Sequence, residues 1–356
     1  VPVGPQEYRM KIAGGPFSYG KGGQSMTPGL ASIIIVTYNH EQFLDACLHS
    51  VMAQDYPHEV ILVDNCSRDK TVPYVREHFP SVRVIESPCN SGYGAGNNLG
   101  VSSARGEYIV VLNPDTIVHE GWLSALVSPL KDQNNIITTP KILTYNGLEI
   151  NTCGNINHFT GLTFTRGFGL NQYQYDNISQ KCGISGACFA IKKDDYILLG
   201  GFDESFFVYN EDSDFSWRAY LLEYEIRFIP DSILNHYYAL KVAPEKLYHL
   251  EIGRYLILRK YYTINDIVRL IPSLSIVELL TFFYAIRLGK DGVKNKIKAM
   301  YKGITSEVSR VEGNKQSLMR SLAAQIPENQ LVTNRVERGF LAICNKIFNL
   351  NYRVFS

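Results

Sequence analysis

Four short apolar segments, separated by stretches with helical spacing, constrain the fold more than any other feature of the sequence. They span residues 32–39, 59–67, 82–87 and 108–112, with helices expected between them at 41–54, 71–79 and 94–104. Each segment is apolar on both faces of a strand, which is typical of a parallel sheet covered by helices on both sides. The sequence therefore predicts an α/β fold with a mostly parallel central sheet.

Polar residues follow these strands at the edge where an open α/β sheet binds its ligands. Asp64 ends the second strand, and it could accept hydrogen bonds from a bound nucleotide or simply begin a turn. Asp115 follows the fourth strand after Pro114, which fixes the direction of the chain. A carboxylate there suits Mg²⁺ or Mn²⁺ beside a diphosphate, although a turn residue is the alternative.

The glycine-rich segment at residues 92–100 is not a dinucleotide-binding fingerprint. The third glycine of that motif would fall on Asn97 or Leu99, and the segment follows the third predicted strand instead of the first. A dehydrogenase is therefore disfavoured.

A third acidic group, formed by Glu211, Asp212 and Asp214, lies in an aromatic stretch that includes Phe206, Phe207 and Tyr209. Carboxylates in an aromatic environment lose hydration and gain proton affinity, as a general base requires. The alternative is a solvated helix start, where acidic residues are favoured.

Charge separates the chain into two regions. Residues 1–236 contain 16 basic and 25 acidic residues, whereas residues 237–356 contain 19 and 9. Residues 241–356 are predicted to be helical, and the apolar run at 273–288 is too short at 16 residues to span a bilayer. Lysines follow it at positions 290, 294, 296, 298 and 302.

This pattern predicts that residues 273–302 bind an anionic membrane surface. The alternative is a buried core or dimer helix beside a solvated basic face, so a homo-oligomer stays open. A nucleic-acid partner is not expected, because the basic region contains no recognised binding module.

The N-terminus and the cysteines indicate a cytosolic protein. Residues 1–30 contain no apolar core of a secretory signal and are expected to be a tail outside the fold. The seven cysteines have neither CxxC spacing nor a neighbouring histidine pattern, which indicates neither a zinc site nor a disulfide framework.

Seven segments taken together resemble the family 2 inverting glycosyltransferases of the GT-A fold, and most closely their rhamnosyltransferase-like branch. The resemblance covers residues 31–240 and rests on TYN at 37–39, VDNCSRDKT at 63–71, NSGYGAGNNLG at 90–100, LNPDT at 112–116, SGACFAI at 185–191, GGFDESFFVYNEDSDFSWR at 200–218, and His236. No motif of the family extends into the C-terminal region.

The resemblance implies a role for each matched residue. Asp212 is expected to be the catalytic base, oriented by Glu211, while Asp115 and His236 are expected to bind Mg²⁺ or Mn²⁺. His236 could instead be a core histidine. The residues expected at the nucleotide are Thr37, Tyr38, Asn39, Asp64, Asn65, Asn97 and Asn113. Those expected at the sugar or acceptor are Ser185, Gly186, Trp217 and Arg218, with a structural pairing to the acidic group as the favoured alternative for Arg218.

One position departs from the family pattern. Many GT-A enzymes have Asp-x-Asp where this chain has Asn113-Pro114-Asp115. An amide brings no charge to a hard dication, so the metal site is expected to be weak until a nucleoside diphosphate supplies its own oxygens.

The activity implied by the resemblance is inverting, metal-dependent transfer of a sugar from a nucleoside diphosphate donor to a hydroxyl. The first choice of donor is dTDP-L-rhamnose, and a UDP-hexose such as UDP-galactose or UDP-GlcNAc is the alternative. A glycan or polyprenyl-linked oligosaccharide is the expected acceptor, at the inner face of the cell membrane. A catalytically silent scaffold subunit that binds nucleotide sugars is the alternative from another class.

Overall fold

The computed structural model describes residues 26–176, 182–238, 243–328 and 334–355. The chain forms two compact units. The first comprises Val1–Asn155, Thr165–Ala219 and Glu223–Tyr238, and the second comprises Ile156–Phe164, Tyr220–Leu222 and Ala239–Ser356. The second unit thus includes two short segments from within the predicted catalytic domain at 31–240.

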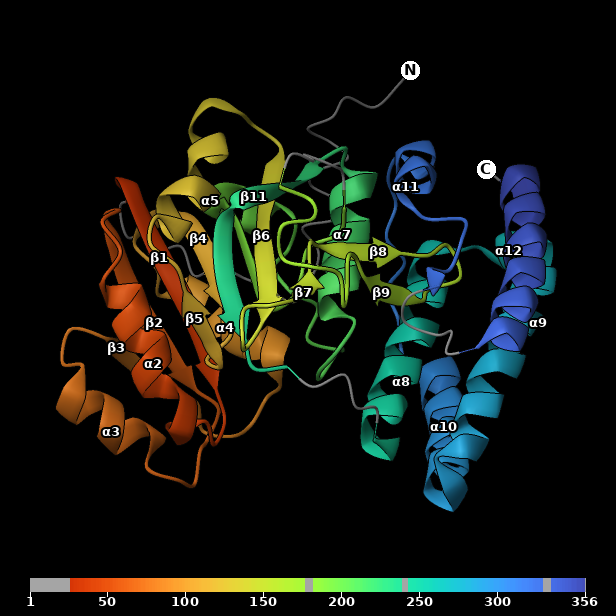
Figure 1. The fold of residues 1–356 in the computed structure, drawn as a ribbon, viewed down its shortest axis with the longest axis horizontal. Coiled ribbons are helices and arrows are strands. Elements are labelled where there is room, and N and C mark those ends of the chain that lie inside the picture. Colours follow the sequence, from red (N-terminus) through yellow and green to blue (C-terminus); the bar gives the residue numbers. More distant parts are fainter. Residues whose placement is uncertain (1–25, 177–181, 239–242, 329–333, 356) are drawn as a thin grey trace. The chain divides into compact units, whose positions relative to one another are not determined.

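The first unit is built on one mixed sheet, which in the described part of the chain has nine strands (Figure 1). Its path runs β3-β2-β1-β4-β10-β6-β11-β5, with β7 paired to β6. The strands are β1 (Thr27–Thr37), β2 (His58–Asp64), β3 (Arg83–Glu86), β4 (Gly106–Leu112), β5 (Thr116–Val118), β6 (Ile136–Thr144), β7 (Ile150–Thr152), β10 (Cys188–Lys192) and β11 (Glu225–His236). A separate two-stranded sheet pairs β8 (Asn155–Asn157) with β9 (Thr163–Thr165).

The four strands predicted from the apolar runs are β1, β2, β3 and β4, and they pair in parallel in the order β3-β2-β1-β4. This confirms the predicted parallel core of the sheet. The expected tail was too long, because β1 already begins at Thr27, where the Thr27 backbone N–H donates to the Arg105 carbonyl. Residues 1–25 lie outside the described part.

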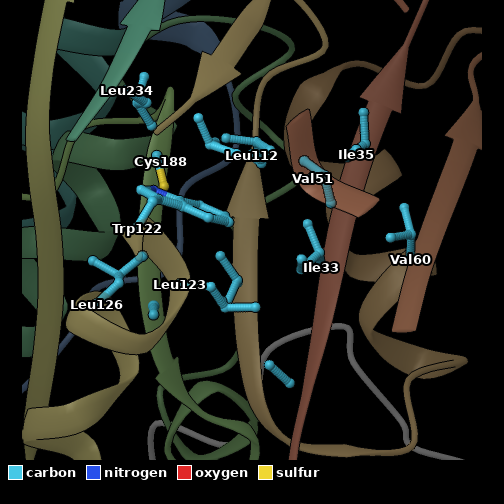
Figure 2. Close-up of a cluster of buried hydrophobic side chains, with 14 of the residues drawn as sticks. Ile33, Ile35, Val51, Val60, Leu112, Trp122, Leu123, Leu126, Cys188 and Leu234 are labelled. Carbon is cyan, nitrogen blue, oxygen red and sulfur yellow. The ribbon is translucent and has the colours of Figure 1, made fainter. Parts of the chain in front are cut away.

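Helices follow the strands. They are α2 (Glu41–Met52), α3 (Thr71–His78), α4 (Tyr93–Ser102), α5 (Trp122–Asp132), α6 (Lys193–Leu198) and α7 (Glu211–Leu221). The first three of them, α2, α3 and α4, are the ones that the spacing predicted. Figure 2 shows the core beside β1 and β4, where Val51 of α2 lies near Ile35 and Trp122 of α5 lies near Cys188. Each such apolar side chain contributes roughly 1.5–3 kcal/mol when fully buried, which holds the ends of the strands in place.

Strand β11 brings two distant parts of the sequence together. It pairs in parallel with β6 and antiparallel with β5, and His236 at its end is the register partner of both Thr144 and Thr116. The Tyr237 backbone N–H also donates to the Asp115 carbonyl at 2.9 Å. His236 is therefore fixed beside the turn that follows β4.

The second unit is helical, as the sequence predicted. Its helices are α8 (Pro244–Tyr261), α9 (Ile264–Arg287), α10 (Gly289–Thr305), α11 (Lys315–Ser321) and α12 (Arg335–Phe355). A buried ionic network joins α8, α9 and α10 through Glu251, Arg254, Glu278 and Lys296. Burial alone would raise the pKa of Glu278, but Arg254 and Lys296 lower that pKa to about 2.

Two expectations about this unit were wrong. Helix α9 has 24 residues, and among the described helices it alone is long and apolar enough to cross a membrane by length and composition. The predicted apolar segment of 16 residues was too short, because the helix begins nine residues before Ser273. Pro272 lies within the helix and does not end it. Lys296 is not part of a solvated basic face, because its side chain is fully buried against Glu251 and Glu278.

Candidate active site

The carboxyl ends of three neighbouring parallel strands place Thr37, Asp64 and Asn113 at one edge of the sheet. Thr37 and Asp64 are register partners on β1 and β2, and Asn113 follows Leu112, which pairs with Ile35 of β1. This is the edge at which α/β sheets bind ligands. The structure thus brings together residues that lie up to 76 positions apart.

Four buried acceptor oxygens at this edge have no hydrogen-bond partner among the described residues. They are Thr37 Oγ1, Asp64 Oδ1, Asn97 Oδ1 and Asn113 Oδ1. Buried polar atoms are nearly always paired in proteins, so several unpaired atoms in one place indicate a polar ligand site. The sequence had left open whether Asp64 begins a turn. It does, because its Oδ2 accepts from the Ser67 N–H at 3.0 Å.

The other residues predicted at the nucleotide shape the surrounding loops. Asn39 has a positive φ of 56°, and its Oδ1 accepts from the Arg68 N–H at 2.8 Å. Asn65 donates from Nδ2 to the Gly92 carbonyl at 2.9 Å. Tyr38 is 40% exposed, which leaves its ring accessible for stacking. Direct contact of these three residues with a nucleotide stays a prediction.

The two residues predicted to bind a metal lie side by side. His236 Nε2 is 3.2 Å from Asp115 Oδ1, and His236 Nδ1 is 3.3 Å from Asn151 Oδ1. Two ligands of one divalent ion lie about 3 Å apart, so an oxygen and a nitrogen at this separation fit such an ion. No group of three or more His, Cys, Asp or Glu residues suited to a metal occurs in the described part of the chain. The pair would need ligands from a bound diphosphate to complete the coordination.

The acidic group of α7 lies at the start of the helix, after a turn in which Tyr209 and Asn210 both have positive φ. Asp212 is held by three hydrogen bonds shorter than 3.1 Å. Its Oδ2 accepts from Asn155 Nδ2 at 2.8 Å and from the Gly186 N–H at 3.0 Å, and its Oδ1 accepts from the Ser213 N–H at 2.7 Å. A weaker contact from the Ser213 hydroxyl to Oδ1, at 3.4 Å, occupies the remaining lone pair, and a substrate hydroxyl would replace it.

The two adjacent carboxyls, Glu211 and Asp212, are held by different hydrogen bonds and therefore differ in proton affinity. Burial, followed by the charge of Asp212, raises the pKa of Glu211 to about 8, and Glu211 Oε2 has no partner among the described residues. Burial also raises the pKa of Asp212, but hydrogen bonds from Gly186, Ser213 and Asn155 oppose that rise. At neutral pH a carboxyl with a pKa of about 8 is mostly protonated, so Glu211 holds a proton, and the hydrogen bonds donated to Asp212 favour its ionised form.

Replacing Glu211 by glutamine is expected to make stability less sensitive to pH. Because the pKa of Glu211 is about 8 in the folded protein and near 4.5 when unfolded, the folded state loses stability as pH rises from 4.5 to 8. The glutamine variant should match wild type at pH 4 and exceed its free energy of unfolding at pH 8. Urea unfolding at both pH values measures this difference, and equal stabilities at pH 8 would contradict the assignment.

Gly186 lies against Asp212, whereas Ser185 contacts Thr139 and Ala187, and a role of either residue along the sugar stays a prediction. A Cβ added to Gly186 would lie 3.3 Å from Asp212 Oδ2, so this glycine keeps the carboxylate accessible. Tyr93, at the start of α4, donates its hydroxyl to the Gly186 carbonyl at 2.5 Å. The Tyr93 N–H donates to the Phe207 carbonyl at 2.9 Å, which ties α4 to the loop before α7.

The prediction that Trp217 and Arg218 contact a sugar or acceptor was wrong. Trp217 is 1% exposed and belongs to the core, because it lies on the inner face of α7. Arg218 is buried, pairs with Asp214 at 3.0 Å, and donates to the Leu199 carbonyl at 2.5 Å. The structural alternative for Arg218 is the one that the structure supports.

Three residues of the site had not been predicted, namely Tyr93, Asn151 and Asn155. No periodic or acidic pattern marks them in the sequence, and only the tertiary contacts identify them. The glycine-rich segment around Tyr93 failed as a dinucleotide fingerprint and contributed to the family resemblance, but neither observation singled out Tyr93. Gly92 has φ of 90°, and a Cβ there would lie 2.3 Å from the Phe207 carbonyl oxygen.

Comparison with known proteins identifies the part of the chain that carries the sheet edge with Thr37, Asp64 and Asp115. Residues 32–197 match the family model described as glycosyl transferase family 2. The chain carries a family 2 glycosyltransferase domain. The predicted family and enzyme class are thereby confirmed.

Curated relatives of this glycosyltransferase domain include two prokaryotic enzymes. The Haloferax volcanii low-salt glycan biosynthesis hexosyltransferase Agl10 is 27% identical over 195 residues, which cover 53% of this chain and 61% of that protein. The Mycobacterium tuberculosis N-acetylglucosaminyl-diphospho-decaprenol L-rhamnosyltransferase is 24% identical over 243 residues, or 61% of this chain and 79% of that protein.

Solved structures confirm the predicted GT-A fold. GalNAc-T7, crystallised with UDP, GalNAc and Mn²⁺, superposes with a TM-score of 0.56 at 18% identity, over 78% of this chain and 57% of that one. S. aureus TarS 1–349 has a TM-score of 0.52 at 18% identity, over 91% of this chain and 89% of that one. At this identity the likeness concerns the fold alone.

Proposed function

We propose that this glycosyltransferase inverts configuration and requires a divalent metal. One observation carries the proposal: the Asp115–His236 pair and the unpaired buried acceptors lie at one sheet edge, in the same unit as Asp212, whose carboxylate accepts three hydrogen bonds. A donor diphosphate would lie at the first group, and an acceptor hydroxyl would approach the second. The expected cofactor is Mg²⁺ or Mn²⁺, which GalNAc-T7 also contained in its crystal.

The reaction that fits these residues is a single in-line displacement. The acceptor oxygen forms a bond to the anomeric carbon while the bond from that carbon to the diphosphate oxygen breaks. Asp212 takes the proton of the hydroxyl, and the nucleoside diphosphate leaves with the bonding electron pair. A divalent ion held by Asp115 and His236 would neutralise the charge that develops on the diphosphate.

dTDP-L-rhamnose is our first choice of donor, because the mycobacterial relative is an L-rhamnosyltransferase. A UDP-hexose is the alternative, supported by the curated relative TarS, a β-N-acetylglucosaminyltransferase 28% identical over 122 residues. The acceptor is proposed to be a polyprenyl-linked oligosaccharide, as the name of the mycobacterial relative suggests.

Incubation with a panel of nucleotide sugars, while release of nucleoside diphosphate is followed, tests the proposed function. Turnover with one donor in the presence of Mn²⁺ would identify the substrate. Thermal unfolding with dTDP and with UDP provides a second readout, because only the nucleotide that binds stabilises the fold. Stabilisation by a nucleotide without turnover of any donor would favour the scaffold alternative, whereas absence of both would contradict the proposed function.

The second unit is proposed to bind an anionic membrane surface at the inner face of the cell membrane. Helices α9 and α12 pack against each other, and the Ser273 hydroxyl donates to Asn351 Oδ1 at 2.6 Å. Each carries a stripe of exposed apolar side chains. On α9 these are Ile264, Val268, Ile271, Leu279, Phe283 and Ile286, and on α12 they are Val336, Phe340, Ile343, Ile347, Leu350 and Val354.

Charge favours a lipid surface over a second copy of the chain. Helix α12 has four basic residues and one acidic residue, and α10 adds four lysines besides the buried Lys296. Like charges would oppose the pairing of two such surfaces, whereas anionic lipids attract them by about 1 kcal/mol for each basic residue near the membrane. Exposed apolar side chains beside basic ones are typical of an interfacial helix.

Replacing Ile343 and Leu350 together by glutamate is expected to reduce binding to anionic vesicles at least about tenfold, because both side chains are exposed on the α12 stripe. Sedimentation with phosphatidylglycerol vesicles measures binding. Ala342→Glu, an exposed position outside the stripe, should bind like wild type apart from the added charge. Equal binding of all three proteins, or self-association through the stripe without vesicle binding, would refute the membrane proposal.

A further inference from the structure

Two asparagines on one short segment, residues 150–155, contact the two chemical groups of the proposed site. Asn151 of β7 lies 3.3 Å from His236 Nδ1 through its Oδ1, and Asn155 of β8 donates to Asp212 Oδ2 at 2.8 Å. We propose that Asn151 positions the metal ligand His236 and that Asn155 positions the base Asp212. The inference rests on the proposed function and adds two residues to it.

The backbone of this segment is fixed by contacts that do not use the two side chains. Buried Arg166 donates to the Cys153 carbonyl from Nε at 2.8 Å and from Nη2 at 2.5 Å. Asn155 exchanges backbone hydrogen bonds with Gly183, at 2.9 Å from its N–H and 2.7 Å to its carbonyl. A change of either asparagine side chain should therefore leave the segment in place.

Asn151 sets which nitrogen of His236 is free to bind a metal. When the His236 Nδ1–H donates to Asn151 Oδ1, the lone pair lies on Nε2, the atom that is 3.2 Å from Asp115 Oδ1. Metal-binding histidines usually donate their second nitrogen in this way, which fixes both the tautomer and the ring orientation. Asn151 is 3% exposed, so water does not compete for this contact.

Asn155 is a hydrogen-bond donor to its partner, whereas Asn151 is an acceptor from its partner. The group that accepts from Asn155 is the Asp212 carboxylate. An amide N–H donated to Asp212 Oδ2 favours the ionised form that a base needs. The titratable groups with charges that reach Asp212 are Glu211 on the same helix, Tyr93 of α4 and Tyr238 after β11. Each of these three groups is either neutral or negative, so none of them can stabilise the negative charge of Asp212. That charge is stabilised by the N–H groups that donate to the carboxylate.

The same isosteric substitution should have opposite effects at the two positions. Asn151→Asp keeps an acceptor oxygen toward His236, whereas Asn155→Asp replaces the donor toward Asp212 by a second carboxyl. We expect Asn151→Asp to retain nucleotide-dependent Mn²⁺ affinity and Asn151→Leu to lower it by about ten- to a hundredfold. We expect Asn155→Asp to leave Mn²⁺ affinity unchanged and to raise the acidic limb of the kcat/KM profile by about one pH unit.

Mn²⁺ affinity is measured by electron paramagnetic resonance with saturating dTDP or UDP, whichever stabilises the wild type. The pH profile is measured with the donor identified by the panel. Asn157→Asp is the matched control, because Asn157 is comparably buried on β8 and accepts from the Thr163 hydroxyl at 3.2 Å, and among the described residues it has no hydrogen bond to His236 or Asp212. It should change neither readout, and thermal unfolding verifies that each variant folds.

The outcomes separate this inference from the proposed function. Wild-type protein without nucleotide-dependent Mn²⁺ binding would contradict the proposed metal dependence itself. If the wild type binds Mn²⁺ and Asn151→Leu binds it equally well, the role of Asn151 is refuted. An unchanged acidic limb in Asn155→Asp refutes the role of Asn155, and loss of folding in Asn155→Asp is resolved with Asn155→Ser, which should shift the limb in the same direction.

Discussion

Replacing Asp212 by asparagine is expected to lower kcat by about a thousandfold, because the acceptor hydroxyl then has no base to take its proton. The affinity for nucleoside diphosphate should stay within about twofold of wild type, since Asp212 lies in α7, whereas the unpaired acceptors proposed to face the nucleotide lie at the ends of β1, β2 and β4 and in α4. Steady-state kinetics and calorimetric titration with the nucleotide measure the two quantities.

Glu211→Gln provides the matched control for this prediction. Burial and the neighbouring charge raise the pKa of Glu211 to about 8, so the side chain is already protonated at neutral pH and glutamine mimics it. The variant should retain most of its activity at pH 7. An inactive Glu211→Gln beside an active Asp212→Asn would reverse the assignment of the two carboxyls.

The second large effect is expected at the metal pair. Asp115→Asn should reduce turnover by about a hundred- to a thousandfold, because the charge that stabilises the departing diphosphate would be lost. Nucleotide affinity should also become independent of Mn²⁺, since the carboxylate 3.2 Å from His236 is the charged member of the pair. Titration of the nucleotide with and without Mn²⁺ measures this dependence.

Asp231→Asn controls for a general loss of negative charge, because Asp231 is exposed on β11, the strand that ends in His236. Its kinetics should match wild type. If Asp115→Asn retains the Mn²⁺ dependence of nucleotide binding, the metal must be held elsewhere, and the proposed site would be excluded.

The sequence predicted those parts of the site that depend on local patterns. Apolar runs define where β1, β2 and β4 end, so Thr37, Asp64 and Asp115 could be placed at one sheet edge without a structure. The contact between Asp115 and His236 spans 121 positions and depends on β11 pairing with both β5 and β6. The residue pattern alone could not decide whether His236 is a metal ligand or a core histidine. The prediction that it is a ligand came from the family resemblance.

The errors have equally physical causes. Trp217 follows the acidic group along the chain, but the turn of α7 directs its ring into the core, and helix phase could not be inferred from so short a segment. Lys296 belongs to a run of lysines at similar spacing, yet it alone turns inward to meet Glu251 and Glu278. Asn151 and Asn155 carry no distinctive pattern, because a single hydrogen bond defines each role.

The ionic network of the second unit has a consequence for how this enzyme would use a membrane. Glu278 lies within the apolar helix α9, and its partners Arg254 and Lys296 belong to α8 and α10. Insertion of α9 into a bilayer by itself would carry an unpaired carboxylate into hydrocarbon, at a cost of roughly 3 kcal/mol or more. If the second unit binds a membrane as proposed, α9 is therefore expected to lie at the surface together with α8 and α10 and not to cross the bilayer alone.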